Sequence, residues 1–355
     1  MTTRTAGILL LSLMFMAAPA QTGGDNIYEF LNLTHSGLIS SVGGSNVSLP
    51  GINLNFAWHN PALLSSDFDK NLALSYSNYI ADINYGLVMY SRSLPKKGNI
   101  AGGLTYLNYG SFTEADAAGN ITGSFRASET ALTIIYSFEL DSMFTFGINF
   151  KPVLSQLEKY TSLGFAFDIG ASWHNPMNLI SAGLVFRNIG YQITTYGGEA
   201  RGNLPFEIMA GISARLAHAP FRFSLTVRHI EKYDLTYQYK QADDSPAQAS
   251  EDFFENVMRH IVIGTEIIPH KNFYLSFGYN HQRRSEMHTG SGVAGSGFSW
   301  GFGVNTSMLS VEFGRATYHL AGSSTHITMI IYPGLMGKKN NFPREIASKS
   351  SFMNF

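Results

Sequence analysis

Residues 143–151 read MFTFGINFK, and large apolar side chains occupy every second position of this stretch. The apolar set is Phe144, Phe146, Ile148 and Phe150. The alternate positions hold small or polar residues, namely Thr145, Gly147, Asn149 and Lys151. Successive side chains of a β-strand point to opposite faces of the sheet, so this alternation predicts a strand with one apolar and one polar face.

The same alternation recurs in residues 162–173, 221–228 and 297–304. In each stretch, large apolar residues alternate with Gly, Ser, Thr and single charged residues. A helix would need apolar residues at a period of 3.6, and the sequence shows no comparable pattern of that kind. The chain is therefore predicted to be all-β.

The composition decides which way the apolar faces point. Charged residues make up 14% of the chain, against about 25% in ordinary soluble domains. The outer face of a soluble β-sandwich also alternates with its core face, but it would carry more Lys and Glu. We therefore predict a transmembrane antiparallel β-barrel, with the apolar faces toward lipid and the polar faces toward the lumen.

The first twenty residues predict export. Arg4 precedes an apolar run at 8–17, and the small residues of Ala18-Pro19-Ala20 suit signal-peptide cleavage before Gln21. A retained membrane anchor is the less favoured alternative, because a helical span needs about 20 apolar residues. The chain contains no cysteine, which excludes disulfides and a lipid-modified cysteine. A formal net charge of -1 gives no basic footprint for nucleic acid. The expected location is the cell outer membrane.

The pattern predicts about fourteen strands. They span residues 71–80, 83–91, 99–109, 129–139, 142–154, 161–174, 178–189, 205–216, 220–230, 257–269, 271–282, 297–306, 308–316 and 324–332. Short connections around Pro95, Asp141, Pro176, His218, His270 and Ser307 alternate with long ones at 110–128, 190–204, 231–256 and 283–296. Outer-membrane barrels have short periplasmic turns and long outward loops, so this alternation also predicts the orientation.

The tetrapeptide WHNP occurs twice, at 58–61 and 173–176. The second copy ends a predicted strand, where proline suits a turn and Trp173 suits the periplasmic aromatic girdle. The first copy precedes the barrel, in a segment with an expected short helix at 27–41. We predict that this segment folds into the lumen as a plug, with Asn60, Pro61 and Ala62 forming the turn that leads to the wall.

The sequence is thus predicted to consist of four parts. Residues 1–20 are the signal peptide, 21–67 the plug, 68–332 the barrel and 333–355 a periplasmic tail. The tail holds four basic residues and one acidic residue, and a solvated end is favoured over a binding arm.

The outward loop at 231–256 is the candidate partner-binding surface. Its aromatic residues are Tyr233, Tyr237, Tyr239, Phe253 and Phe254. The three tyrosines are expected to continue the strand pattern above the membrane as an exposed edge. The two phenylalanines either hold a partner or belong to the aromatic girdle. The carboxylates of this loop lack the spacing of a calcium loop, so a solvated loop is favoured there.

Charged residues on the polar faces predict a lumen network that includes Glu207, Arg228, Arg222 and Arg215. Hairpin geometry places Glu207 and Arg228 at about the same height on neighbouring strands. A self-paired network that holds the plug is favoured over a ligand path.

No catalytic, metal or cofactor site is predicted, and the expected role is non-enzymatic. His59 and His174 lack further ligands at metal spacing. The G-x-G-x-x-G match at 290–295 lies in a loop with no following helix to receive a phosphate.

Several longer stretches resemble a known group of barrels. They are GGDNIYEFLNLTHSGLISSVGG at 23–44, NPALL at 60–64, YLNYGSFTEADAAGNITGSF at 106–125, KPVLSQLEKYTSLGFAFDIG at 151–170, LVFRNIG at 184–190 and LPFEIMAGISARLAHAPFRFSLTVRHIEKYDLTY at 204–237. Together they resemble the PorQ family of the type IX secretion system. That family belongs to the PorV/PorQ group, which is related to the long-chain fatty acid transporters. One departure is LTHSG at 33–37, where small and basic residues would be expected.

The resemblance implies a barrel that helps to form a cell-surface attachment complex, in which secreted cargo is processed and anchored. The implied partners are the surface protein PorZ, the sortase-like peptidase PorU and the PorV barrel, together with membrane lipid and lipopolysaccharide. The alternative is a plugged transporter of hydrophobic compounds such as fatty acids. Transport predicts an apolar pocket around the plug and a lateral opening or kinked strand, whereas docking predicts aromatic, partly ordered outward loops.

Overall fold

The computed structural model describes residues 26–49, 53–80, 83–175, 179–198, 200–235, 253–286, 295–319 and 322–333. The predicted signal peptide, Tyr237, Tyr239 and nearly all of the predicted tail lie outside these residues, and so does the G-x-G-x-x-G match except for its last glycine.

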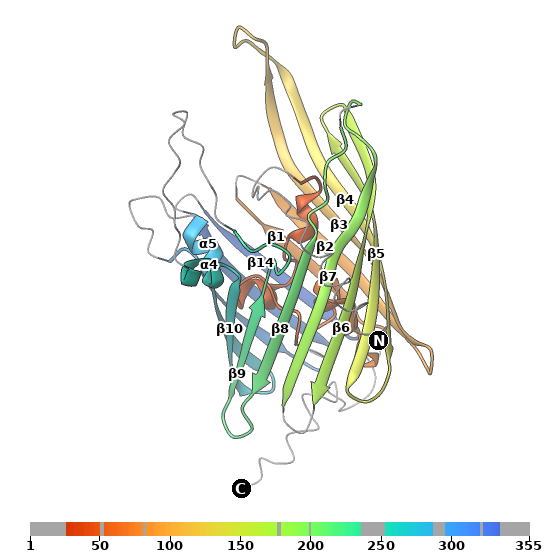
Figure 1. The fold of residues 1–355 in the computed structure, drawn as a ribbon, viewed down its shortest axis with the longest axis vertical. Helices are drawn as coiled ribbons and strands as arrows, with labels where there is room; N and C mark the ends of the chain where they lie inside the picture. The colour runs from red at the N-terminus through yellow and green to blue at the C-terminus, as the bar shows by residue number, and fades with distance from the viewer. Residues whose placement is uncertain are drawn as a thin grey trace, which may run out of the picture.

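Fourteen antiparallel strands in the described residues form one closed barrel (Figure 1). The strands are β1 (Leu72–Asn78), β2 (Asn84–Leu94), β3 (Gly98–Ala115), β4 (Ile121–Glu139), β5 (Phe144–Leu157), β6 (Tyr160–Asn175), β7 (Ile180–Thr194), β8 (Glu207–Arg215), β9 (Phe221–Val227), β10 (Ile261–His270), β11 (Phe273–Asn280), β12 (Phe298–Asn305), β13 (Leu309–His319) and β14 (Gly322–Ile331). Each strand pairs with its neighbours in the chain, and β1 closes on β14 with Leu72 opposite Ile331. All fourteen predicted strands are present.

The apolar faces point outward, as predicted. In β12, Phe298 and Trp300 are about half exposed, whereas Ser299 between them is buried. Neighbouring strands add stacked rings on the same outer face, such as Phe150 and Phe167 with centroids 4.8 Å apart. Such a belt would destabilise a protein in water, and it matches the lipid-facing band of a transmembrane barrel. Within the described residues, no helix is long and apolar enough to cross a membrane.

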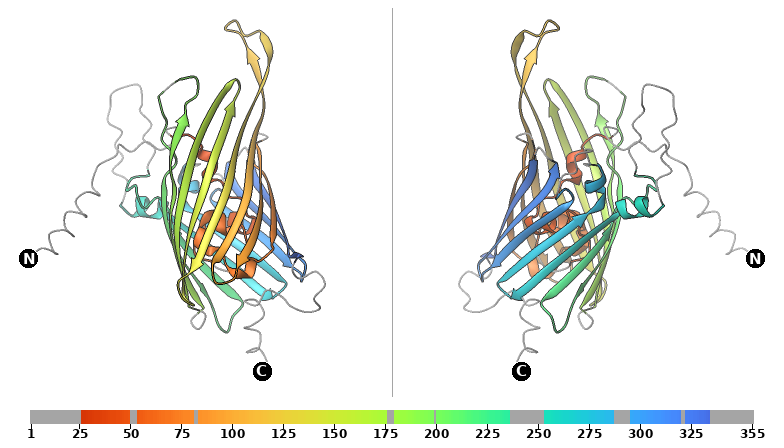
Figure 2. Two further views of the ribbon diagram at one scale, coloured as in Figure 1. Left: turned by 90° about the vertical axis from the view of Figure 1, so that its right-hand side faces the viewer. Right: turned by 90° about the vertical axis from the view of Figure 1, so that its left-hand side faces the viewer.

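The wall is much taller on one side than on the other (Figure 2). The predicted loop at 110–128 is wrong in part, because β3 and β4 continue as a paired ribbon to Ala115 and Ile121. A bulge at Gly110, whose φ is 86°, interrupts the register. Asp116 then forms the turn by accepting hydrogen bonds from the backbone N–H groups of Ala118 and Asn120. On the other side, β8 and β9 have only 9 and 7 residues.

Strand β9 ends earlier than predicted. His229 has a φ of 52°, a backbone conformation that ends an extended strand, and Lys232 donates a turn hydrogen bond to the His229 carbonyl. The expected exposed strand edge is therefore wrong over its described part, where Leu235 is buried. The start of the predicted strand at 257 is also wrong, because helix α4 (Phe253–Arg259) precedes β10. A second helix, α5 (His281–Glu286), follows β11 and occupies the last two residues of the predicted strand 271–282.

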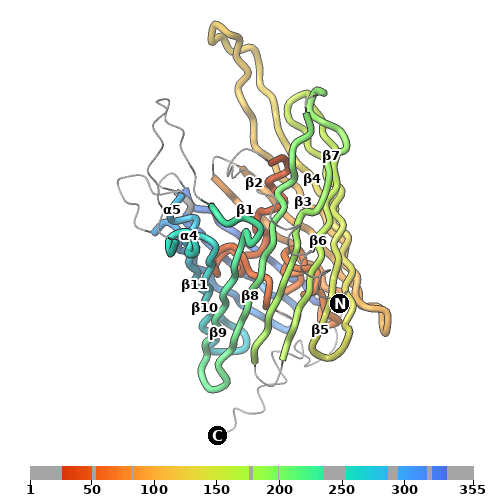
Figure 3. The backbone as a smooth tube through the Cα atoms, in the orientation of Figure 1, coloured from red at the N-terminus to blue at the C-terminus, as the bar shows by residue number. Residues whose placement is uncertain are grey.

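The segment ahead of β1 lies inside the barrel, where Figure 3 draws it in red and orange. It forms η1 (Glu29–Asn32), α2 (Gly37–Ser41), α3 (Phe56–His59), η2 (Pro61–Leu63) and η3 (Ser66–Phe68). The single helix predicted at 27–41 is wrong, because two short helices occupy that range. Ser36 starts the second one by accepting a hydrogen bond from the Ile39 N–H, the usual role of serine at a helix start.

Candidate functional site

The plug and the wall that holds it form the candidate functional site. Nearly every described plug residue from Thr34 to Leu64 is buried. On the side of β1 to β4, the contact is apolar: Trp58 and Leu31 pack in one cluster with Leu87, Met89 and Ile135 of the wall. Smaller apolar clusters join the plug to Tyr274 of β11 and to Val185 and Met209 of β7 and β8. Buried polar and charged groups of the wall lie between these clusters and hold the plug at specific points.

The Asn60 turn packs against three glycines on the inward faces of neighbouring strands, which together form the glycine floor. Asn60 donates from its side chain to the carbonyls of Val47 and Ala171, at 2.9 and 3.3 Å, and accepts from the Ala62 N–H. A Cβ added to Gly147, Gly170 or Gly183, on three adjacent strands, would overlap this turn or the Val47 carbonyl. Small residues on the polar face of the strands thus allow the backbone of the plug to contact the wall directly.

Glu312 of β13 holds the start of α2. Its carboxylate accepts hydrogen bonds from the Asn53 side chain at 2.7 Å, from the Ser36 hydroxyl at 3.1 Å and from the Leu38 N–H at 3.2 Å. Gly37 packs directly against the Glu312 backbone. A buried carboxylate of the wall therefore accepts three hydrogen bonds from plug groups, which couples the position of the helix to the wall.

A second anchor joins β5, β6 and β7 to the plug. Lys151 and Asp168, both with fully buried side chains, form an ion pair of 2.5 Å. Asn188 in β7 donates from its backbone to Asp168 and accepts from the Lys151 ammonium, at 2.9 and 3.1 Å. The ammonium also lies 4.7 Å from the ring centroid of Trp58, which places a cation against a plug aromatic.

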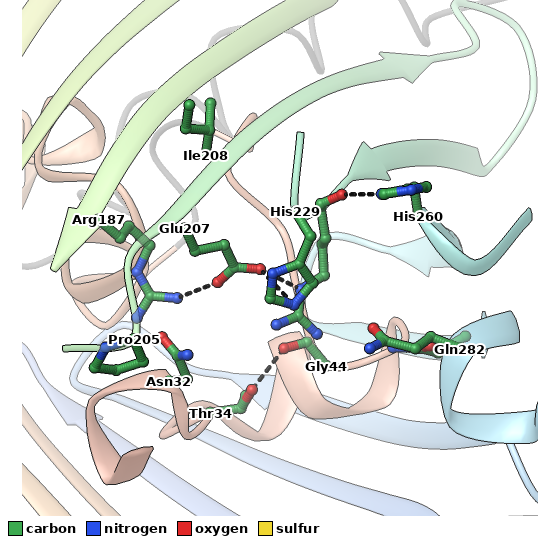
Figure 4. A network of polar contacts seen from close by, with 12 residues as sticks. Asn32, Thr34, Gly44, Arg187, Pro205, Glu207, Ile208, His229, His260 and Gln282 are labelled. Atoms are coloured by element: carbon green, nitrogen blue, oxygen red, sulfur yellow. Dashed lines mark hydrogen bonds and ion pairs between the residues drawn. The ribbon is translucent and has the colours of Figure 1, made fainter. Parts of the chain in front are cut away.

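A third anchor centres on Glu207 at the start of β8, which Figure 4 shows between Arg187 and His229. Glu207 contacts Arg228 at 2.7 Å and Arg187 at 3.5 Å. Arg187 in turn donates to the Leu31 carbonyl of the plug at 2.8 Å. His229 lies between Glu207 and Glu231, at 3.5 and 3.1 Å. This cluster connects the plug to the chain that leaves β9.

The other two predicted network residues lie elsewhere. Arg222 pairs with Glu266 of β10, and Arg215 lies opposite Arg222 in the β8 to β9 ladder. The predicted single set is thus divided between Glu207 with Arg228 and a separate group on β8 to β10.

Two buried plug histidines lie among cationic groups. Burial, followed by His326, Arg187 and Lys151, lowers the pKa of His35 to about 3. Burial and the nearby Arg187 and other cations hold the pKa of His59 well below its ordinary value. Both rings are therefore neutral at physiological pH.

The described aromatic residues of the outward loop are strongly exposed. Tyr233 is 71% exposed, and Phe253 and Phe254 in α4 are 68% and 67% exposed. Helix α4 is held in place by Asn256, which donates to the Tyr233 carbonyl at 2.6 Å, and by Glu255, which contacts His281 of α5 at 2.9 Å.

Sequence reasoning missed Asn188 and Asn32. Asn188 has a φ of 56°, at a register shift between β6 and β7. Asparagine tolerates this left-handed region better than most residues, so an isolated Asn inside an apolar strand pattern was the available signal. Asn32 carried no signal, because its role depends on its position opposite Asn188. Among the described residues, no group of three or more His, Asp or Glu side chains is placed to hold a metal ion.

Comparison with known proteins supports the fold alone. No family model matches the sequence, and no curated protein matches it. The structure of the Pseudomonas putida toluene transporter TodX aligns over 84% of this chain and 97% of its own, at 13% identity and a TM-score of 0.50. A deltaS2 mutant of TodX, a monoaromatic hydrocarbon channel, aligns over 86% and 98%, at 12% identity and a TM-score of 0.53. The chain thus has the fold of a TodX-like outer-membrane barrel: fourteen closed antiparallel strands around an N-terminal plug.

Proposed function

We propose that this chain is a non-enzymatic docking barrel of the type IX secretion system, which holds a surface protein in the attachment complex. The observation that carries the proposal is the fixed plug. Hydrogen bonds join it to the wall at Glu312, at Asn188 and at Arg187, and the buried Lys151 ammonium lies against the ring of Trp58. Because these anchors lie on different strands around the lumen, movement of the plug would have to break several buried polar contacts together.

The outward end supports the same proposal. Tyr233, Phe253 and Phe254 expose aromatic surface beside the short strands β8 to β10, and aromatic residues are enriched where proteins bind one another. The proposed partners are PorZ, PorU and PorV, and the resemblance of the sequence stretches supports their identity. Membrane lipid and lipopolysaccharide would surround the wall.

Co-purification tests this proposal. The tagged protein is extracted from its own outer membrane in mild detergent, and the proteins that stay bound through size exclusion are identified. Docking predicts a surface protein in near one-to-one amount, which is lost when Tyr233, Phe253 and Phe254 are changed to serine. A matched control changes the lipid-facing Phe298 and Phe302 to leucine. Recovery of the barrel alone, with bound lipid, would contradict docking.

Transport of small hydrophobic compounds is the second candidate. It is supported by the shared fold with TodX, which is described as a toluene transporter, and by the apolar surface between the plug and β1 to β4. The register shift of β7 at Asn188 is an irregularity of the wall, and this candidate predicts a local irregularity such as a kinked strand. The fold comparison favours transport, whereas the sequence stretches and the anchored plug favour docking. Uptake of labelled toluene or oleate into cells that express the barrel decides between them, since docking predicts no uptake above that of vector-only cells.

A further inference from the structure

His260, which lies between α4 and β10, has both ring nitrogens against backbone carbonyls. Its Nδ1 lies 2.8 Å from the Arg228 carbonyl oxygen, and its Nε2 lies 3.3 Å from the Tyr233 carbonyl oxygen. A carbonyl oxygen can only accept a hydrogen bond, whereas a neutral imidazole has one N–H group and one bare nitrogen. Only the protonated ring, which carries two N–H groups, can therefore donate to both carbonyls at once.

His229 has a similar arrangement with carboxylates in place of carbonyls (Figure 4). Its Nδ1 lies 3.1 Å from Glu231, and its Nε2 lies 3.5 Å from Glu207 of β8. The side chain of His229 is 19% exposed, so water screens these contacts only in part. Contacts between a cation and a carboxylate are stronger than those of a neutral donor. The positions of both carboxylates therefore favour the protonated ring.

The positive charges near His229 are compensated by other groups. Arg228 and Arg187 contact Glu207, at 2.7 and 3.5 Å. Among the described residues, no arginine or lysine pairs with Glu231, whose second oxygen accepts from the Ile208 N–H at 2.8 Å. The carboxylate of Glu231 thus remains available to the ring of His229.

The charged groups next to His260 belong to α4 and α5. Arg259 precedes the ring in the chain and lies 3.9 Å from Glu255. Glu255 also contacts Nε2 of His281 at 2.9 Å. The other nitrogen of His281 lies 2.9 Å from the Tyr279 hydroxyl, which can donate or accept a hydrogen bond. His281 therefore differs from His260, because its hydroxyl partner suits a neutral or a protonated ring.

The two rings hold the segment at 228–235, which leaves β9 and carries the exposed Tyr233. The backbones at Arg228 and His260 are joined by an N–H to carbonyl bond of 2.8 Å. The Tyr233 carbonyl accepts from His260 and also from Asn256 of α4, at 3.3 and 2.6 Å. These contacts connect the segment to α4, while His229 connects it to β8.

We propose that His229 and His260 form a pH-sensitive latch that holds the segment at 228–235 against α4 and β8. Histidine gains or loses its proton between about pH 5 and 8. The latched state binds these protons more tightly than the open state, so the latch is strongest at acid pH and weakens as the pH rises. The latch goes beyond both proposed functions, because it acts whether or not a partner or a transported compound is present.

Hydrogen exchange tests the latch. The full-length barrel is reconstituted in lipid bilayers, and peptides covering 228–235 and 253–260 are compared at pH 5.5 and 8.0, with rates corrected for the intrinsic effect of pH. The latch predicts that protection in these peptides falls about tenfold at the higher pH, the effect of losing one hydrogen bond from a charged group. Peptides of the plug are the internal control and should not lose protection at pH 8.0, because His35 and His59 are neutral there.

Two variants identify the groups responsible. His229→Gln combined with His260→Gln cannot gain a proton at either position, so the pH difference in the two peptides should disappear. The matched control is His218→Gln, an exposed residue of the turn between β8 and β9, which should keep the full difference.

Equal protection of the wild-type peptides at the two pH values would overturn the proposal, and this comparison requires no variant. Loss of protection in the plug at pH 8.0 would also overturn it, since the whole barrel would then be loosening. A pH difference that persists in the double variant would assign the effect to groups other than these two histidines.

Discussion

The side chain of Asn188 in β7 donates a hydrogen bond of 2.8 Å to the side-chain oxygen of Asn32 in the plug. The same amide donates to the Pro205 carbonyl at 2.9 Å. The backbone at Asn188 adopts a positive φ at a register shift in the wall. Asn188 therefore adopts the backbone conformation found at the register shift of β7 and also binds the plug through its side chain.

Asn188→Val should destabilise the folded barrel by about 3 kcal/mol, because a β-branched residue is strained at this φ and the buried hydrogen bonds are lost. Asn188→Gly keeps the conformation and loses only the side-chain bonds, so it should cost less. Urea unfolding in lipid bilayers, followed by tryptophan fluorescence, measures both. Equal costs for the two variants would show that backbone conformation contributes little.

Gly170→Ala should displace the Asn60 turn without unfolding the barrel. The added methyl group would overlap the Asn60 side chain, and overpacking of this kind costs about 1–3 kcal/mol. The expected result is faster proteolysis of the plug with unchanged heat resistance of the barrel in gels. Gly102→Ala is the matched control, since its nearest contact is 3.9 Å away. If both variants show wild-type proteolysis, the glycine floor does not position the plug.

Lys151→Met should be severely destabilising, because it leaves the buried Asp168 without its cation. Breaking a buried ion pair in this way costs about 3–5 kcal/mol. The double change Lys151→Met with Asp168→Asn should recover much of that loss. A double-mutant cycle of unfolding free energies measures the coupling, and additive losses would mean that the two groups do not stabilise each other.

Acid should loosen the plug. The ordinary pKa of His35 is 6.5, and its value in the folded protein is about 3, so between these two values the unfolded state binds more protons than the folded state. The contribution that the neutral His35 makes to folding stability is therefore fully present above pH 6.5, and it is lost as the pH drops toward 3. His59 shifts in the same direction.

Hydrogen exchange of plug peptides at pH 7.5 and 4.5, corrected for intrinsic rates, measures this loss of protection. The variant His35→Gln with His59→Gln should lose less protection between these pH values than the wild type. Equal losses in the two proteins would assign the acid sensitivity to other groups.

Much of the wall could be predicted from the sequence because each strand carries its own evidence. In β5 and β12 large apolar residues alternate with smaller or polar residues, and lipid on one face favours this local pattern. The extended β3 to β4 ribbon could not be predicted so well. Residues such as Ser111, Thr113 and Ser124 are exposed in the two-stranded ribbon, where polar side chains on both faces remove the alternation.

For the plug, the turn at Asn60 could be predicted from the sequence, but its contacts with the wall could not. Asn60 could be assigned to a turn because the adjacent proline restricts the backbone. Its contacts with Ala171 and with Gly147, Gly170 and Gly183 depend on residues that lie far away in the sequence, on three other strands. Glu207 differs, because both of its arginine partners come from strands next to β8 in the chain: Arg187 lies directly opposite it in the β7 to β8 ladder, and Arg228 follows the end of β9.

The seam between β1 and β14, where Leu72 lies opposite Ile331, determines the order of assembly. The plug precedes the first strand in the chain, while the strand that seals the cylinder comes last. A segment so tightly enclosed has no room to enter a finished wall. We therefore expect the sheet to close around a plug that is already in place.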